Sequence, residues 1–245
     1  MKPIAMITGA AGGVGRALAQ ELHDSHTLVL VSRDRQHLEA HYGSEGHLVE
    51  ADVSTPRGAA HAMKTCVEQV GTPTALVNCA GAVLIQPMHQ TSPEQYQACL
   101  AANLDSAFYS LQAFVDTVRQ AEQRGSAVLI SSVAAQYGVP NHEVVSMTKA
   151  GVEGLIRAAA ATYAPAGIRI NGVAGGLMET PATEHLLDNE TTRTGAERQY
   201  PLHGVGEPEG LAGLIGYLLS ARAEWITGQI WNYDGGFSAI RPLVK

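Results

Sequence analysis

The sequence predicts an α/β fold in which a doubly wound parallel sheet of about seven strands is flanked by helices on both faces. Three observations support this prediction. Short apolar segments alternate with longer helical patterns from one end of the chain to the other. Several short segments are apolar almost throughout, as strands covered on both faces must be. A glycine-rich turn joins the first short segment to the first helical pattern.

The individual elements follow from length and periodicity. Short, apolar segments predict strands over Ile4–Ile7, Thr27–Val31, Leu48–Glu50, Ala75–Val77, Ala127–Ile130, Arg169–Val173 and Gln229–Trp231. Helical patterns between them predict helices over Val14–Leu22, Pro56–Val70, Pro93–Arg119 and Lys149–Tyr163. This alternation favours parallel strands joined by right-handed crossovers.

One segment, Met178–Val205, departs from this pattern. It is polar, weakly periodic and placed after the carboxyl end of a predicted strand. Ligands of open α/β sheets bind at that edge, so we expect the segment to form a substrate lid over residues 178–205. No Pro/Ser-rich linker or charge block divides the 245 residues, which indicates a single domain over residues 1–245.

Composition narrows the classes of partner. The net charge is −7 and no Lys/Arg cluster occurs, which argues against nucleic acid. No apolar run approaches the ~20 residues of a membrane-spanning helix, and the N-terminus enters a strand without a signal peptide. Three cysteines without CxxC spacing are typical of reduced thiols in a cytoplasmic protein. His37 and His41 lack accompanying ligands, so no metal site is expected.

The glycine-rich turn indicates a nucleotide site. It reads Thr8-Gly9-Ala10-Ala11-Gly12-Gly13-Val14-Gly15. Its glycines let backbone amides approach a pyrophosphate, and the positive end of the helix dipole faces the same point. The arrangement is typical of a Rossmann-type dinucleotide site, and its TGxxxGxG spacing resembles the fingerprint of the short-chain dehydrogenase/reductase family.

Further motifs of that family follow in order along nearly the whole chain. Asn78-Cys79-Ala80-Gly81 is similar to the family's NNAG motif, with Cys79 in place of the second asparagine. Asn171 with Gly176 and Thr180 resembles the segment over the nicotinamide, although Gly175 replaces its proline. Near the C-terminus, Thr227-Gly228-Gln229 and Asp234-Gly235-Gly236 complete the pattern. The resemblance implies cofactor binding by Gly9, Gly13, Val14, Gly15, Ser32, Arg33, Asp52, Val53, Asn78, Ala80, Gly81, Lys149, Gly176 and Thr180.

The end of the second strand bears on cofactor choice. NAD-specific sites usually place an acidic residue there to bind the ribose hydroxyls. Ser32 removes that charge, and Arg33 is able to make charge-assisted bonds to a 2′-phosphate. The sequence therefore favours NADP(H), against the alternative that Arg33 is only a solvated loop residue.

The family's active-site residues are matched at three positions and missing at the central one. Ser132 aligns with the catalytic serine, Lys149 with the lysine and Asn103 with the helix asparagine of the relay. In the family, a tyrosine four positions before the lysine donates a proton to the substrate oxygen. Here that position is Val145, which has no proton to give.

His142 is a candidate for the missing proton donor. At about 100° per residue, a helix would place it within roughly 20° of the meridian of Lys149. The enoyl-thioester reductases, a divergent branch of the family, place their tyrosine at this spacing, and histidine titrates near neutrality. Alternatively, Asn141 caps the helix and His142 with Glu143 fills its first turn. Tyr137, Glu179 and His185 stay open as other contributors.

Three functions therefore remain: an NADP(H)-dependent oxidoreductase for a small carbonyl or enone, a catalytically disarmed NADP(H)-binding protein with an assembly or sensing role, and a non-redox lyase or isomerase. Retention of Ser132 favours the oxidoreductase, because in the family this residue contacts substrate. The resemblance also implies a homotetramer, with a homodimer as the alternative.

Overall fold

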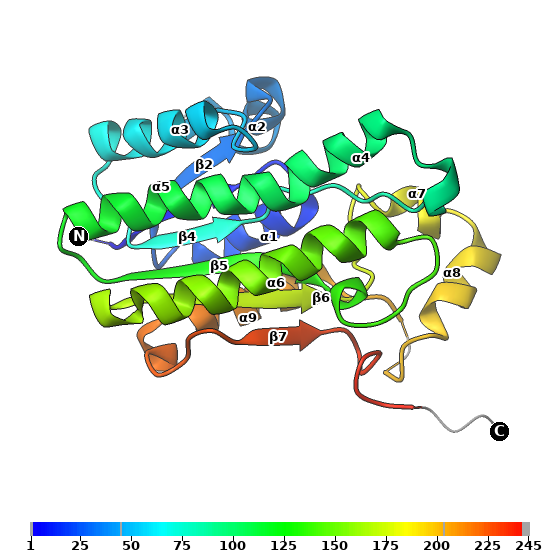
Figure 1. Cartoon of the computed structure of the whole chain (residues 1–245). Coiled ribbons are helices and arrows are strands. Elements are labelled where there is room, and N and C mark those ends of the chain that lie inside the picture. Colours follow the sequence, from blue (N-terminus) through cyan, green and yellow to red (C-terminus); the bar gives the residue numbers. More distant parts are fainter. Residues whose placement is uncertain (1, 45, 203, 242–245) are drawn as a thin grey trace.

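The computed structural model describes residues 2–44, 46–202 and 204–241. In this part of the chain seven parallel strands form one sheet in the order β3-β2-β1-β4-β5-β6-β7 (Figure 1). The strands are β1 Ile4–Thr8, β2 Thr27–Ser32, β3 His47–Glu50, β4 Ala75–Asn78, β5 Gly125–Ser132, β6 Ile168–Gly175 and β7 Ile230–Tyr233. The order reverses direction at β1, as in a doubly wound sheet, so the predicted fold class is confirmed.

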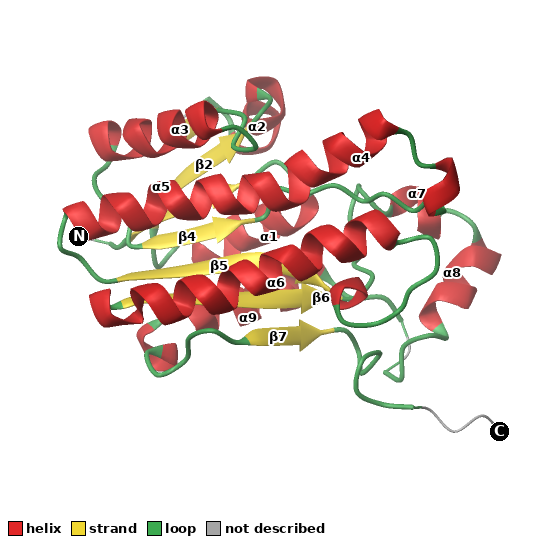
Figure 2. Ribbon diagram, in the orientation of Figure 1, coloured by secondary structure: helices red, strands yellow, loops and turns green. Residues whose placement is uncertain are grey.

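Helices cover both faces of the sheet (Figure 2). They are α1 Gly13–Leu22, α2 Arg35–Tyr42, α3 Pro56–Gln69, α4 Pro93–Leu100, α5 Ser106–Gln120, α6 Glu143–Tyr163, α7 Glu184–Leu187, α8 Glu190–Glu197 and α9 Pro208–Leu219. Each face has its own apolar core. Met6 of β1 packs into the core under α3, α5 and α6, whereas Ala5 and Ile7 pack into the core under α1 and α9. This alternation explains why the strands are apolar throughout.

Two predicted helices differ from the observed ones. The segment Pro93–Arg119 is not one helix, because a π-helical turn over Ala101–Asp105 separates α4 from α5. This turn contains Asn103. The helix expected to start at Lys149 begins six residues earlier, at Glu143, where no proline or glycine interrupts it.

The hydroxyl of Ser110 on α5 is buried and has no hydrogen-bond partner among the described residues. Since burying an unpaired hydroxyl is unfavourable, we expect Ser110→Ala to raise the free energy of unfolding by about 1 kcal/mol in urea titrations. Ser106→Ala is the matched control. The Ser106 hydroxyl donates to the Ala102 carbonyl at 2.6 Å, so its loss should destabilise the protein. Equal effects of the two substitutions would contradict the assignment.

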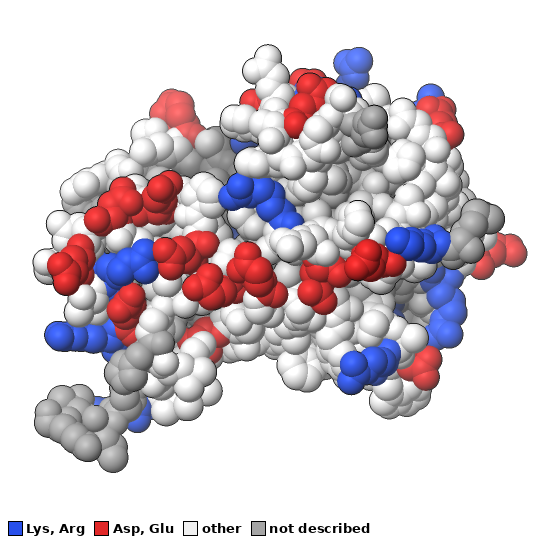
Figure 3. All heavy atoms as spheres, turned by 180° about the vertical axis from the view of Figure 1, so that it is seen from behind, with Lys and Arg blue, Asp and Glu red and all other residues white. Residues whose placement is uncertain are grey.

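The surface is mixed and acidic overall. On the face opposite to that of Figure 1, acidic side chains form a band, and Lys and Arg are separated by acidic or uncharged residues (Figure 3). Within residues 2–44, 46–202 and 204–241, none of the helices combines the length and apolarity needed to cross a bilayer.

Candidate active site

A cavity of about 190 Å³ lies at the carboxyl ends of β1 to β4. Seven of the residues predicted to bind a cofactor line it: Gly9, Ser32, Arg33, Asp52, Val53, Ala80 and Gly81. The remaining lining residues are Gly12, Val31, Ala51, Ser54, Cys79, Ala102 and Ser106. The cavity therefore sits where the reversal of strand order leaves a crevice for a ligand.

Glycines form the base of this cavity and the start of the helix beside it, and at Gly9 and Gly15 the backbone leaves no room for a side chain. Gly9 has φ +67°, and a Cβ there would lie 2.6 Å from the amide nitrogen of Ala80. A Cβ on Gly15 would overlap the Gly9 carbonyl oxygen. Gly12 is the N-cap of α1 and provides no side chain to satisfy the first amides of the helix. These amides and the positive end of the helix form a cradle that fits a pyrophosphate.

Asn78 lies behind the cavity and links β1 and β4 to α5 through hydrogen bonds. Its Oδ1 accepts a hydrogen bond from the Thr8 hydroxyl at 2.5 Å, and its Nδ2 donates to Ser106 Oγ at 3.3 Å. Asn78 is buried and does not line the cavity itself. The side chain thus ties the ends of β1 and β4 to α5.

The rim of the cavity carries one charge of each sign. Arg33 is exposed, and within the described part of the chain its guanidinium makes no hydrogen bond or ion pair. The Asp52 carboxylate is hydrogen-bonded to a nearby residue: its Oδ1 accepts from the Ser54 amide at 3.1 Å and from the Ser54 hydroxyl at 2.7 Å. Asp34, next to Arg33, caps α2 through the His37 amide. Arg33 is therefore available to an anionic group at the rim.

Lys149 on α6 is buried, and its Nζ donates to the carbonyl oxygen of Ile130 at 2.8 Å. Burial lowers the pKa of Lys149 from 10.5 to about 8, an effect that the nearby thiols of Cys99 and Cys79 partly offset. A Cβ on Gly81 would lie 3.4 Å from this Nζ, so the amine reaches the edge of the cavity.

The Asn103 side chain also lies next to Gly81. Its Nδ2 donates to the Ala82 carbonyl at 3.0 Å and to Cys99 Sγ at 3.2 Å, and its Oδ1 accepts from the Ala82 amide at 3.2 Å. A Cβ on Gly81 would lie 2.9 Å from that Oδ1. The π-helical turn thus brings Asn103 to the point that Lys149 reaches from α6.

Ser132 and Val145 come from the end of β5 and the first turns of α6. Ser132 is half-buried, and its Oγ accepts a hydrogen bond from the Ala134 amide at 3.2 Å. Val145 is 7% exposed and packs in an apolar cluster with Val144, Cys99, Leu84 and Tyr96. Its surroundings supply packing rather than polar partners.

His142 is the N-cap residue of α6, with no side-chain capping bond. The alternative in which Asn141 caps this helix is wrong, because Asn141 has φ +63° and precedes the cap residue. His142 also lies outside the helix, so the helical-meridian argument does not fix its direction. The ring Nδ1 lies 2.7 Å from the Pro140 carbonyl oxygen and donates to it, which leaves Nε2 as the nitrogen that faces other partners.

The segment after β6 folds back towards the glycine turn. A Cβ on Gly13 would lie 2.8 Å from Thr180 Cβ, so Thr180 sits directly over the start of α1. Gly176 donates its amide to the Tyr233 carbonyl at 3.0 Å. The structure therefore brings Thr180 to Gly13 and Gly176 to the end of β7, and Thr180, Gly13 and Gly176 lie outside the lining of the cavity.

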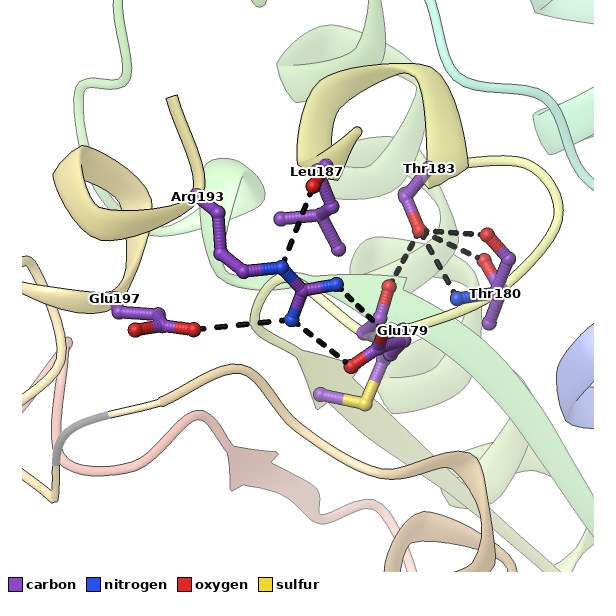
Figure 4. Close-up of polar contacts among 7 residues, drawn as sticks. Glu179, Thr180, Thr183, Leu187, Arg193 and Glu197 are labelled. Atoms are coloured by element: carbon purple, nitrogen blue, oxygen red, sulfur yellow. Dashed lines mark hydrogen bonds and ion pairs between the residues drawn. The ribbon is translucent and has the colours of Figure 1, made fainter. Parts of the chain in front are cut away.

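Arg193 on α8 organises this segment (Figure 4). Its guanidinium binds both carboxylate oxygens of Glu179, at 2.6 and 3.3 Å, and lies 3.7 Å from a Glu197 oxygen. Its Nε also donates to the Leu187 carbonyl at 3.3 Å. These bonds hold the pKa of Glu179 below its ordinary value. Beside them lies a second cavity of about 360 Å³, lined by Glu179, Thr180, Pro181, Glu184, Leu187, Asp188 and Arg193.

Sequence reasoning missed several residues of the first cavity. Gly12 lies within the glycine turn itself, and Ser54 follows Asp52 by two residues, so both were within reach of the motifs. Ala102 and Ser106 carried no signal, because only the π-helical turn brings them to the cavity. Among the described residues, no group of three or more His, Cys, Asp or Glu side chains is placed to hold a metal ion.

The chain is similar to known proteins along nearly its whole length. Residues 9–238 match the family model described as enoyl-(acyl carrier protein) reductase. A tropinone reductase homolog of Arabidopsis thaliana is 31% identical, over 98% of this chain and 92% of that protein. Glucose 1-dehydrogenase 2 of Bacillus subtilis (strain 168) is 29% identical, over 96% and 94%. A solved short-chain type dehydrogenase/reductase from Mycobacterium ulcerans superposes with a TM-score of 0.90 at 25% identity, covering 98% and 90%.

Proposed function

Because the chain belongs to the short-chain dehydrogenase/reductase family, we propose that it is an NADP(H)-dependent oxidoreductase for small carbonyl or enone substrates. The observation that carries the proposal is the convergence of Asn103 and Lys149 on Gly81, at the edge of a glycine-cradled cavity. Burying an amine is unfavourable even with one hydrogen bond, such as that of Lys149 to the Ile130 carbonyl, so a lysine held there favours a working site.

The residues of the cavity fit a dinucleotide. Gly9, Gly13, Val14 and Gly15 would hold the pyrophosphate at the start of α1, and Asp52 with Val53 would contact the adenine. Lys149 would bind the nicotinamide ribose, and Gly81 with Ala80 would form part of the wall. Asn78 would support this wall from behind, and Gly176 with Thr180 would contact the cofactor from the segment after β6. When bound, the nicotinamide supplies a hydride to the substrate.

Arg33 is proposed to select the phosphorylated cofactor, since its guanidinium is exposed at the rim and Ser32 brings no competing carboxylate. We expect Arg33→Ala to weaken NADPH binding by about 10-fold and to leave NADH binding unchanged, measured by fluorescence titration. Arg35→Ala is the control, because Arg35 is engaged with Glu39 at 2.7 Å and with the Leu48 carbonyl. Equal loss of NADPH and NADH affinity in the Arg33 variant would contradict the assignment.

The protein's own contribution to the reaction centres on Ser132. Its hydroxyl is proposed to donate a hydrogen bond to the substrate oxygen as negative charge develops there. Val145 supplies no proton, so the proton comes from His142 Nε2 in its protonated form or from water. An activated double bond needs its oxygen only to be held while the product is protonated from water. The match to an enoyl reductase model supports substrates of that kind.

The test is NADPH consumption by the wild type on a panel of ketones, diketones, enones and tropinone, together with NADP⁺ reduction in the presence of glucose. Turnover of any of them supports the proposal, and loss of that turnover in His142→Phe assigns the acid to His142. Binding of NADPH without turnover on the whole panel would overturn it. The apolar packing of Val145 favours the disarmed binding protein in that case.

We further propose that residues 178–205 form the substrate lid. Thr180 lies over Gly13, and Arg193 fixes the neighbouring Glu179 to α8 and to the end of α7. The protein is proposed to be a cytoplasmic homotetramer or homodimer that acts on a small molecule.

A further inference from the structure

A buried carboxylate that the proposed reaction does not use lies one helical turn after Lys149. Glu153 on α6 has a side chain that is 8% exposed. Its Oε1 accepts hydrogen bonds from Ser131 Oγ at 3.0 Å and from Gln136 Nε2 at 2.7 Å. Its Oε2 lies 3.6 Å from Nη1 of Arg157, a side chain that is 57% exposed. Burying a carboxylate is unfavourable unless its partners are well placed, so these bonds define the environment of Glu153.

The two donors to Oε1 flank Ser132. Ser131 precedes it at the end of β5, and Gln136 follows the short 3₁₀ turn Val133–Ala135. The Ser132 hydroxyl itself accepts from the Ala134 amide at 3.2 Å, inside this turn. One carboxylate oxygen therefore ties both ends of the turn that carries Ser132. Hydrogen bonds to a carboxylate are shorter and stronger than neutral ones, which suits a fixed turn.

The same network reaches the C-terminal end of the sheet. Gln136 Oε1 accepts from Asn232 Nδ2 at 3.0 Å, and this amide also donates to Ser238 Oγ at 2.7 Å. The Ser238 amide donates to Asp234 Oδ2 at 3.0 Å. A Cβ on Gly176 would lie 3.4 Å from Asp234 Cβ, so the network ends beside the proposed nicotinamide segment.

We propose that Glu153 is a positioning residue, which fixes the Ser132 hydroxyl by holding Ser131 and Gln136 and couples this turn to residues 232–238. The role assigned to Ser132 rests on the proposed function, whereas the fixation of the turn does not. A misplacement of about 1 Å at a reacting group lowers rates by as much as about 100-fold, so the effect of releasing the turn is large.

Four variants test the proposal in the full-length protein. Glu153→Leu removes the acceptor, and Gln136→Ala breaks one of its bonds from an exposed position. Glu153→Gln keeps an oxygen that accepts both bonds, and Arg157→Gln removes only the outer ion pair. We expect the first two to lower kcat by about 10-fold or more with NADPH affinity unchanged, and the last two to retain wild-type kcat. Each substitution is made in the wild-type sequence, or in Val145→Tyr if only that variant turns over a substrate.

A second readout needs no turnover. Hydrogen exchange of the peptide that contains Ala134 should become faster in Glu153→Leu and Gln136→Ala but not in Glu153→Gln or Arg157→Gln, while exchange in β1 stays unchanged. Wild-type exchange at Ala134 in both disruptive variants would overturn the proposal, as would faster exchange with unchanged kcat. If no protein turns over any substrate, the proposed function fails, and exchange still decides whether Glu153 fixes the turn. If Glu153→Leu does not fold, kcat and hydrogen exchange are compared between Gln136→Ala and Glu153→Gln.

Discussion

Val145→Tyr is expected to raise kcat for NADPH-dependent reduction of ketones by about 100-fold over the wild type. The substitution introduces a hydroxyl one helical turn before Lys149, at the position where the sequence resemblance implies a tyrosine. Lys149 is buried and holds its Nζ at the edge of the cavity, so an ammonium is available to favour ionisation of a neighbouring phenol. The measurement is initial-rate kinetics for both proteins on one panel of ketones.

Val145→Phe is the matched control for bulk. The residue packs against Val144, Cys99, Leu84 and Tyr96, so either aromatic ring must displace some of these side chains, at about 1–3 kcal/mol. Phenylalanine shares this strain but has no proton to donate. We expect it to reduce ketones no faster than the wild type. A gain in Val145→Phe equal to that in Val145→Tyr would show that the pocket shape, and not the hydroxyl, limits the reaction.

Lys149→Met is expected to abolish a pH dependence of stability worth roughly 3 kcal/mol. Burial lowers the pKa of Lys149 from 10.5 to about 8, so between these values the unfolded chain binds a proton that the folded chain has released. The contribution of Lys149 to the free energy of unfolding therefore rises as the pH increases from 8 to 10.5. Methionine carries no proton in either state, so the stability of the wild type relative to Lys149→Met increases over the same range.

Urea titrations of both proteins without cofactor, at pH 7.5 and at pH 10.5, measure this difference. Cys66 and Tyr42 have pKa values raised to about 12 and act in the opposite direction, but they are common to both proteins and cancel. Lys64→Met is the control, because the Lys64 side chain is 73% exposed and its replacement should show no such pH dependence. A wild-type advantage that stays constant with pH would contradict the burial of an amine at Lys149.

Local features of the site were predictable from the sequence because short-range geometry determines them. The glycine turn from Gly9 to Gly15 follows β1 directly, and the spacing of Val145 and Lys149 places them on adjacent turns of one helix. A strand covered on both faces is likewise predictable, because it is apolar almost throughout.

Features that depend on distant partners were not predictable. The π-helical turn at Ala101–Asp105 has no proline or glycine to mark it, and it depends on contacts of Asn103 with Ala82. The cap at His142 lacks a side-chain bond, so the favourable residue Asn141 was a misleading signal. The donors to Glu153 lie 22 and 17 residues away in the chain, beyond any helical periodicity.

The strand order has a consequence for synthesis on the ribosome. In the sheet β1 lies between β2 and β4, and β5, β6 and β7 follow β4 in sequence order. Each of these last three strands therefore pairs with a strand that has already been synthesised. At about 5–20 residues per second, several seconds separate β4 from the emergence of β5. During that interval the edge of β4 that later pairs with β5 has no partner strand, and it presents backbone groups with which another polypeptide is able to pair.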